Sequence, residues 1–208
     1  MTDLDIPRGT ASSRRDFLKT TAAALAASAA GCSKVAQIPA RQADMAIAAW
    51  SDLAENAEPT PSDLKTMAER LTESAIDNLG GMRRFVTRGD VVWLKPNAGF
   101  IRSPEFAVNT NPDVVATLVR LCFDAGAKRV RVGDHASYGS SMTYSHSGIE
   151  EAVKAVDGEI VYLNENRFKE VDLGGRRLAV WPLYQDMIEA DLLINVPIVK
   201  QHSLTKIS

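Results

Sequence analysis

The chain has few cysteines, few aromatic residues and little excess charge of either sign. Its 208 residues include 2 cysteines, 6% aromatic residues and a formal net charge of −2. Two cysteines cannot form a disulfide framework, a zinc ribbon or an iron–sulfur cluster held by four thiolates of one chain. The near-neutral charge argues against a nucleic-acid partner, which normally requires a basic excess. The low aromatic content argues against an aromatic-rich binding surface.

Several longer sequence signatures are missing as well. No uninterrupted apolar run reaches about 18 residues, which excludes a membrane-spanning helix. The sequence has neither a Walker phosphate loop nor a G-x-G-x-x-G fingerprint, and it lacks the G-x-S-x-G elbow of serine hydrolases. What is present is a composition of 45% hydrophobic and 24% charged residues, which suits one globular domain with a sizeable core.

Residues 1–32 have the pattern of an export signal. Arg14 and Arg15 precede Phe17 and Leu18, and a weakly apolar, alanine-rich run follows over 20–30. This order is typical of a twin-arginine signal, so the predicted partner is the twin-arginine translocation machinery and the predicted location is the periplasm. The alternative is an amphipathic N-terminal helix of a cytosolic protein.

The signal ends in Ala29, Ala30, Gly31 and Cys32, an arrangement that resembles a lipobox. Lipidation of Cys32 would hold the protein at the outer face of the cytoplasmic membrane without spanning it. Ordinary cleavage within 27–29 is the alternative, because Ala29 stands where a lipobox has leucine. If Cys32 is lipidated, Cys122 is the one thiol left in the mature chain, and its apolar helical surroundings predict core packing.

After the signal, residues 33–60 are expected to form a tether and an N-terminal helix over 43–57, and residues 61–208 an α/β domain. Thr60, Pro61 and Asp63 have the pattern of a helix start, and Gly80 predicts its end. Beyond this helix, strand and helix patterns alternate. Strands are predicted at 91–94, 129–132, 159–163 and 192–196, helices at 111–126, 147–156 and 183–190, and a hairpin at 168–173 and 177–180.

This alternation predicts a mainly parallel sheet with helices on both faces, a Rossmann-like three-layer arrangement. Ligands of such sheets bind beyond the carboxyl ends of the strands. Polar residues follow every predicted strand, so we expect these groups to share one edge of the sheet. They are Lys95 and Asn97; Gly133, Asp134 and His135; Asn164, Glu165 and Asn166; Asn195, Lys200 and His202.

Four of these residues are candidates for catalysis. Lys95 at a buried strand end is suited to bind an anion or, with a lowered pKa, to act as a base or nucleophile. Asp134 is suited to bind a cation or to orient a neighbouring lysine or His135. Lys200 and His202 suit an anionic substrate or proton transfer next to a carboxylate.

Each candidate also has a simpler interpretation. Lys95 would extend along the sheet rim towards solvent, Asp134 would cap a turn, and His202 would be exposed in a loop. The predicted ligand-binding residues are Asn97, Asn111, Gly133, Asn195 and Thr205.

The sequence does not identify a metal or other cofactor, although Asp134, His135 and His202 could ligate a metal ion. The segment from Gly139 to Met142 is interpreted as a flexible, serine-rich loop, and Ser145 with His146 as the start of the following helix.

A series of short motifs, taken in order over residues 63–208, resembles the DUF362 family of domains of unknown function. The motifs are Gly80-Gly81 to Phe85; Gly89-Asp90; Lys95-Pro96-Asn97; Thr110-Asn111-Pro112; Asp124-Ala125-Gly126-Ala127; Gly133-Asp134; Ser147-Gly148-Ile149; and Asn195-Val196-Pro197 with Lys200, His202, Ser203, Leu204 and Thr205. The resemblance implies no settled activity. Some members carry ferredoxin-like cysteine clusters, which this chain does not have, and members continue beyond its last segment. The domain is therefore expected to be incomplete at its C-terminus.

Three hypotheses about function follow. The first is an exported enzyme or cofactor-dependent protein that acts on a small anionic ligand. The second is a redox accessory protein that works with an iron–sulfur partner supplying the thiolates. The third is a non-catalytic, lipid-tethered binding protein.

Overall fold

The structure is a computed structural model that describes residues 43–51, 58–137, 139–202 and 206–207. The expected signal, with Arg14, Arg15 and Cys32, lies outside these residues, as does Thr205. Within the described residues, no helix is both long enough and apolar enough to cross a membrane.

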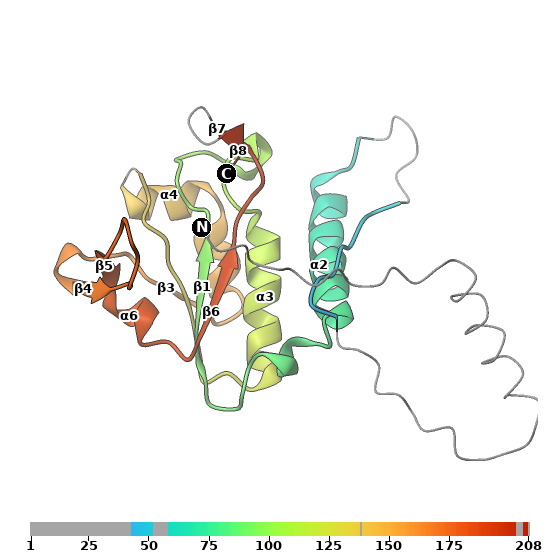
Figure 1. The fold of residues 1–208 in the computed structure, drawn as a ribbon. Coiled ribbons are helices and arrows are strands. Elements are labelled where there is room, and N and C mark those ends of the chain that lie inside the picture. The colour runs from blue at the N-terminus through green and yellow to red at the C-terminus, as the bar shows by residue number, and fades with distance from the viewer. Residues whose placement is uncertain (1–42, 52–57, 138, 203–205, 208) are drawn as a thin grey trace, which may run out of the picture. The chain divides into compact units, whose positions relative to one another are not determined.

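A four-stranded parallel sheet forms the centre of the domain (Figure 1). Its strands are β1 (Val91–Pro96), β2 (Arg129–Val132), β3 (Glu159–Ile160) and β6 (Leu192–Val196), in the order β3-β2-β1-β6. The register pairs Lys95 of β1 with Asn195 of β6. The polar residues that end these strands therefore lie at one edge of the sheet, as the sequence predicts.

Two helices, α3 (Pro112–Ala125) and α5 (Ile149–Lys154), cover one face of the sheet. Apolar side chains of β1 and β2 meet those of the two helices in the core. These residues are Val92, Leu94, Val130, Val132, Val115, Val119, Cys122, Ile149 and Val153. Cys122 is fully buried, and burial raises the pKa of its thiol to about 12. The prediction that Cys122 packs in the core is confirmed.

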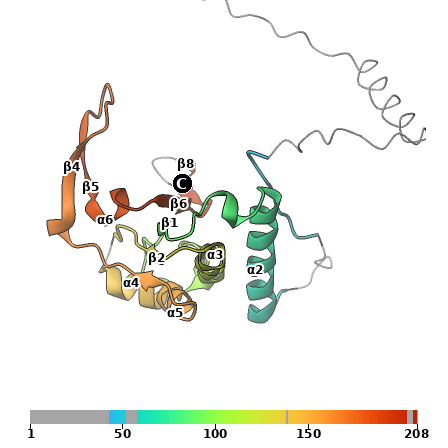
Figure 2. The same cartoon turned by 90° about the horizontal axis from the view of Figure 1, so that it is seen from below.

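The opposite face carries a second layer made of the short helix α6 (Gln185–Ile188) and the hairpin β4 (Phe168–Asp172) and β5 (Val180–Tyr184) (Figure 2). Trp93 of β1 reaches this layer, with its ring centroid 5.6 Å from that of Tyr184. Arg131 of β2 lies 3.7 Å from Asp186 of α6. The predicted α/β arrangement with a parallel sheet is therefore confirmed, although its second layer is mostly a hairpin.

The helix α2 (Pro61–Asn78) begins and ends close to the predicted positions. Thr60 and Asp63 form a reciprocal capping box, and Pro61 occupies the first turn, where its missing N–H costs nothing. The helix has no fully buried residue, and it packs against α3, where Glu73 pairs with Arg120.

Residues 43–51 are not helical, so the helix predicted over 43–57 is wrong for this part, and 52–57 lie outside the described residues. Arg84 donates to the Ala43 carbonyl at 2.6 Å and lies 3.6 Å from Asp44. Met45 and Ile47 are exposed, so a helix here would bury little apolar surface to offset its ordering entropy.

The segment interpreted as a flexible loop is instead the helix α4 (Ser140–His146). Its residues Thr143 and Tyr144 are fully buried, so packing stabilises a helix that serine-rich composition disfavours. His146 ends this helix and does not begin the next one.

Three further elements are shorter than predicted. The helix α5 covers Ile149–Lys154 in place of 147–156. The strand β3 has two residues in place of 159–163. The predicted helix 183–190 is reduced to α6 because residues 183 and 184 belong to β5.

Candidate functional site

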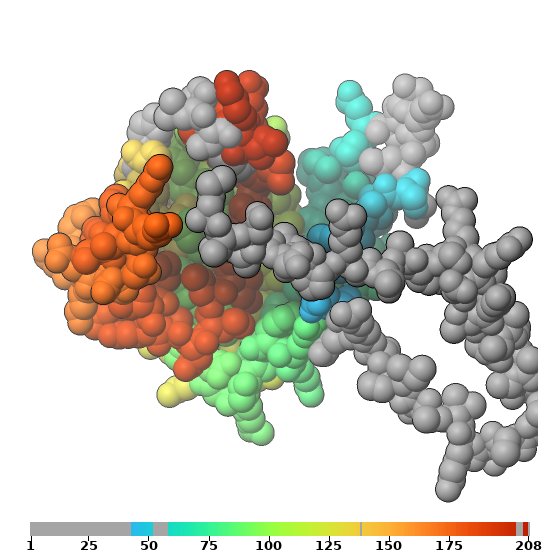
Figure 3. All heavy atoms as spheres, viewed as in Figure 1, coloured from blue at the N-terminus to red at the C-terminus, as the bar shows by residue number. Residues whose placement is uncertain are grey.

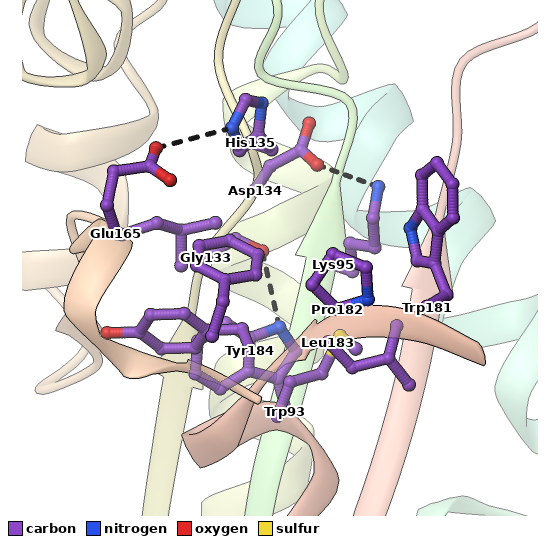
Figure 4. A pocket seen from close by; sticks show the side chains of 13 residues that line it. Trp93, Lys95, Gly133, Asp134, His135, Glu165, Trp181, Pro182, Leu183 and Tyr184 are labelled. Carbon is purple, nitrogen blue, oxygen red and sulfur yellow. Dashed lines mark hydrogen bonds and ion pairs between the residues drawn. The ribbon is translucent and has the colours of Figure 1, made fainter. Parts of the chain in front are cut away.

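Lys95 and Asp134 form an ion pair at the carboxyl ends of β1 and β2 (Figure 4). Lys95 Nζ lies 2.7 Å from Asp134 Oδ1, and the Asp134 side chain is only 8% exposed. Asp134 Oδ2 also accepts the Ala98 N–H at 2.9 Å, and the Asp134 N–H donates to the Tyr144 hydroxyl at 2.6 Å. Asp134 therefore pairs with a lysine, as its predicted orienting role requires, while that role stays a prediction.

Lys200 also lies at the carboxyl edge of the sheet. Its side chain contacts Asn97, from which it is separated by 103 positions in the sequence. Its ammonium donates to Asn97 Oδ1 and, at 2.8 Å, to the Val108 carbonyl. It also lies 4.8 Å from the ring centroid of Phe100. Burial lowers the pKa of Lys200 from its ordinary value, while Asp134 acts in the opposite direction.

Two buried polar side chains hold the loop after β1 in place. Thr110 Oγ1 accepts the Asn97 N–H at 2.8 Å and donates to the Val196 carbonyl at 2.7 Å, which ties the ends of β1 and β6 together. Asn109 Oδ1 accepts the N–H groups of Gly99 and Phe100. No local pattern in the sequence indicates this role of Asn109, because its partners lie nine and ten residues away.

A polar cavity of about 370 Å³ lies between these groups. Its lining includes all four predicted catalytic residues together with the predicted ligand-binding residues Asn97 and Asn195. The catalytic candidates are Lys95, Asp134, Lys200 and His202. The structure thus brings them to one place, as the strand-end argument requires, while their chemical roles stay predictions.

A second, aromatic cavity of about 470 Å³ adjoins the polar one and shares Lys95, Asp134 and His135 with it (Figure 4). Its other walls are mainly aromatic and apolar side chains. They are Trp93, Leu163, Phe168, Trp181, Pro182, Leu183, Tyr184 and Met187. The low aromatic content argued against such a surface, but folding gathers the few aromatic residues of β1, β4 and β5 at one place.

Gly133 is needed where Trp93 packs against the end of β2. A Cβ added at Gly133 would lie 2.4 Å from Trp93 Cζ2, and the Trp93 indole N–H donates to the Gly133 carbonyl at 3.2 Å. Gly133 lines the aromatic cavity, so its predicted place at the site agrees with the structure. The close backbone approach that it permits is to Trp93.

Asn111 has a different task from the one predicted. Its side chain caps α3 by accepting the N–H groups of Asp113 and Val114, and it lines neither of the two cavities. An Asn-Pro-Asp sequence at a helix start is sufficient to indicate this capping role.

The described residues contain no group of three or more His, Cys, Asp or Glu side chains placed to bind a metal ion. The set of Asp134, His135 and His202 is therefore not assembled as a metal centre. His135 Nε2 lies 3.9 Å from Glu165 Oε1, and both side chains are largely exposed.

Residues 92–208 match the family described as Domain of unknown function, DUF362. The chain belongs to the DUF362 family. The match begins within β1, so the DUF362 region contains the lining residues of both cavities.

A DUF362 relative supports this comparison. A thylakoid-associated protein of Synechocystis sp. is 33% identical over 129 residues, which cover 62% of this chain and 39% of the relative. The chain thus aligns with well under half of that relative's length. No solved structure matches the chain significantly.

Proposed function

We propose that this protein binds a small organic monoanion in the polar cavity at the carboxyl edge of its sheet. The observation that carries the proposal is the convergence of Lys95, Lys200 and His202 on one cavity from distant parts of the chain. Ligands of open parallel sheets bind at this edge, which supports the same assignment.

The charge of the lining favours a single negative charge on the ligand. Lys95 and Lys200 contribute two positive charges and Asp134 one negative charge, so these three residues together carry a net charge of +1. A carboxylate balances this charge. A doubly charged phosphate would leave an uncompensated negative charge in a partly enclosed site.

Both lysines keep N–H donors for the ligand. An ammonium has three N–H donors; Lys95 directs one towards Asp134, and Lys200 directs two towards Asn97 and Val108. The remaining donors, two on Lys95 and one on Lys200, suit the two oxygens of a carboxylate.

Within this site we assign anion binding to the Lys200 ammonium and a positioning role to Asp134. Burial lowers the pKa of Lys200, so this ammonium gives up its proton more readily than that of an exposed lysine. Asp134 acts through Lys95, because its two carboxylate oxygens are taken by Lys95 and Ala98. His202 lines the cavity and is a candidate for moving a proton.

Acetate is the simplest probe of this site. Purified protein should bind acetate in saturation-transfer NMR, and Lys200→Met should weaken the binding about tenfold because a charge-assisted hydrogen bond is lost. Lys128→Met is the matched control, because Lys128 is exposed just before β2, at the opposite edge of the sheet. Equal acetate affinity of the Lys200→Met variant and the parent would refute the proposed site.

The proposal extends to location. The paired arginines and Cys32 support export by the twin-arginine machinery, to the periplasm or to a lipid anchor at the outer face of the cytoplasmic membrane. The relative's association with thylakoids supports a place at a membrane surface.

A further inference from the structure

We infer that the ligand of this protein is an aromatic carboxylate, whose ring occupies the aromatic cavity while its carboxylate lies between Lys95 and Lys200. The inference rests on the proposed function for its anionic part. The aromatic cavity, about 470 Å³ in volume, identifies the rest of the molecule.

The two cavities share three lining residues, Lys95, Asp134 and His135. A ligand whose carboxylate lies against Lys95 in the polar cavity therefore has the aromatic cavity beside it. Figure 4 shows Lys95 and Asp134 at one side of the aromatic cavity, with Trp181 beside Lys95. The polar side chains of this cavity are mainly those of Lys95, Asp134, His135 and Glu165. The other lining residues are mainly aromatic or apolar.

The aromatic walls are held in place by contacts among themselves. The ring of Phe168 meets that of Tyr184 edge to face, with centroids 5.3 Å apart and planes inclined by 70°. Tyr184 in turn lies 5.6 Å from Trp93, which is 1% exposed. The indole N–H of Trp93 already donates to the Gly133 carbonyl, so a ligand need not supply a hydrogen-bond acceptor for it.

Trp181 is the part of the cavity that a ligand would bury. It belongs to β5 of the hairpin, which lies at the surface of the molecule (orange in Figure 3). Its side chain is 51% exposed although it lines the cavity. A bound ring would cover part of this indole, and aromatic pairs gain more than their buried area alone provides. The volume of the cavity is within the usual range for small-molecule sites, about 300–1,000 Å³.

The probes for this inference are 2-naphthoate, which has the ring and the carboxylate, and acetate, which has the carboxylate alone. Titration of the full chain by calorimetry and NMR should show 2-naphthoate binding at least about tenfold tighter than acetate. Trp181→Ala should remove most of that advantage and leave acetate binding unchanged. Leu178→Ala is the matched control, because Leu178 is also on the hairpin and 46% exposed but does not line the cavity.

The outcomes separate this inference from the proposed function. If Lys200→Met weakens both probes but Trp181→Ala binds 2-naphthoate as the parent does, the monoanion site stands and the aromatic assignment is wrong. If Trp181→Ala selectively weakens 2-naphthoate while Lys200→Met changes neither probe, the aromatic cavity stands and the proposed anion site is wrong. Binding of 2-naphthoate that is no tighter than that of acetate overturns the inference outright.

Discussion

At the scale of single residues, small and buried groups set the shape of the site. Gly133 leaves room for the Trp93 ring, Thr110 joins the ends of two strands, and Asp134 fixes Lys95. Each has a partner that is distant in the sequence: Gly133 and Trp93 are 40 positions apart, Thr110 and Val196 are 86 apart, and Asp134 and Lys95 are 39 apart. Substitutions at these positions should therefore affect stability and binding together.

Gly133→Ala should destabilise the protein by about 1–3 kcal/mol, the usual range for an overpacked core. The added methyl would lie 2.4 Å from Trp93 Cζ2, and this indole is held by its hydrogen bond to the Gly133 carbonyl and by its packing against Tyr184. The free energy of unfolding in urea measures the effect. Gly139→Ala is the control, since a Cβ there meets no atom within 4 Å and should cost less than about 1 kcal/mol. Equal stability of the two variants would contradict the packing argument.

Acetate binding should weaken at alkaline pH, and it should do so at a lower pH than an ordinary lysine would produce. Burial lowers the pKa of Lys200, so the ammonium loses its proton, and with it its attraction for the anion, as the pH rises through that lowered pKa. Acetate titrations at a series of pH values test this expectation. Lys200→Arg should retain binding at higher pH, because arginine stays protonated. A parent and an arginine variant with the same pH profile would show that Lys200 does not control binding.

At the scale of secondary-structure elements, helix ends follow the sequence closely, while helix existence depends on packing. Local signals begin α2 at Thr60 and α3 at Asn111, where the capping side chain and the adjacent proline suffice. The helix α4 has no such cap and forms where two buried residues, Thr143 and Tyr144, anchor it. Residues 43–51 show the opposite case. They contain helix-forming alanines but are not helical, because they have little to pack against.

Thr60→Ala should destabilise α2 by about 1 kcal/mol, because the Asp63 N–H loses its hydroxyl acceptor and the Asp63 carboxylate keeps only the backbone N–H of residue 60. Loss of helical circular dichroism on heating, together with urea unfolding, measures the change. Thr66→Ala on the same helix is the control. Its hydroxyl bonds only the Ser62 carbonyl, and alanine is the better helix former, so stability should stay equal or rise. A larger loss for Thr66→Ala than for Thr60→Ala would contradict the importance of the cap.

At the scale of the whole molecule, the topology explains why distant residues meet. The strand order β3-β2-β1-β6 places β1 between β2 and β6, and all strands are parallel. The residues that end these three strands are therefore neighbours, although Lys95 and Asn195 are 100 positions apart in the sequence. The hairpin β4–β5 lies on the face of the sheet opposite to α3 and α5. It brings Phe168 and Trp181 to the carboxyl edge of the sheet, near Lys95.

Export of the whole protein should depend on the paired arginines. Replacement of both Arg14 and Arg15 by lysine should keep the protein in the cytoplasm, because the twin-arginine pathway requires the pair and not its charge alone. Cell fractionation with antibody detection is the measurement. Arg8→Lys, outside the pair, should be exported as the parent is. Export of the double variant at the parental level would exclude this route.

The sequence by itself determined the alternation of strands and helices, the caps of α2 and α3, and the edge of the sheet at which polar residues gather. These features depend on periodicity and on neighbours a few positions away, which one sequence displays. Only the tertiary structure decided that α4 is a helix, that Asn111 lines neither cavity, and that aromatic residues from three strands form a cavity beside Lys95. These outcomes depend on burial and on contacts between distant segments, which no local sequence pattern indicates. The low aromatic content likewise gave no indication of the aromatic cavity.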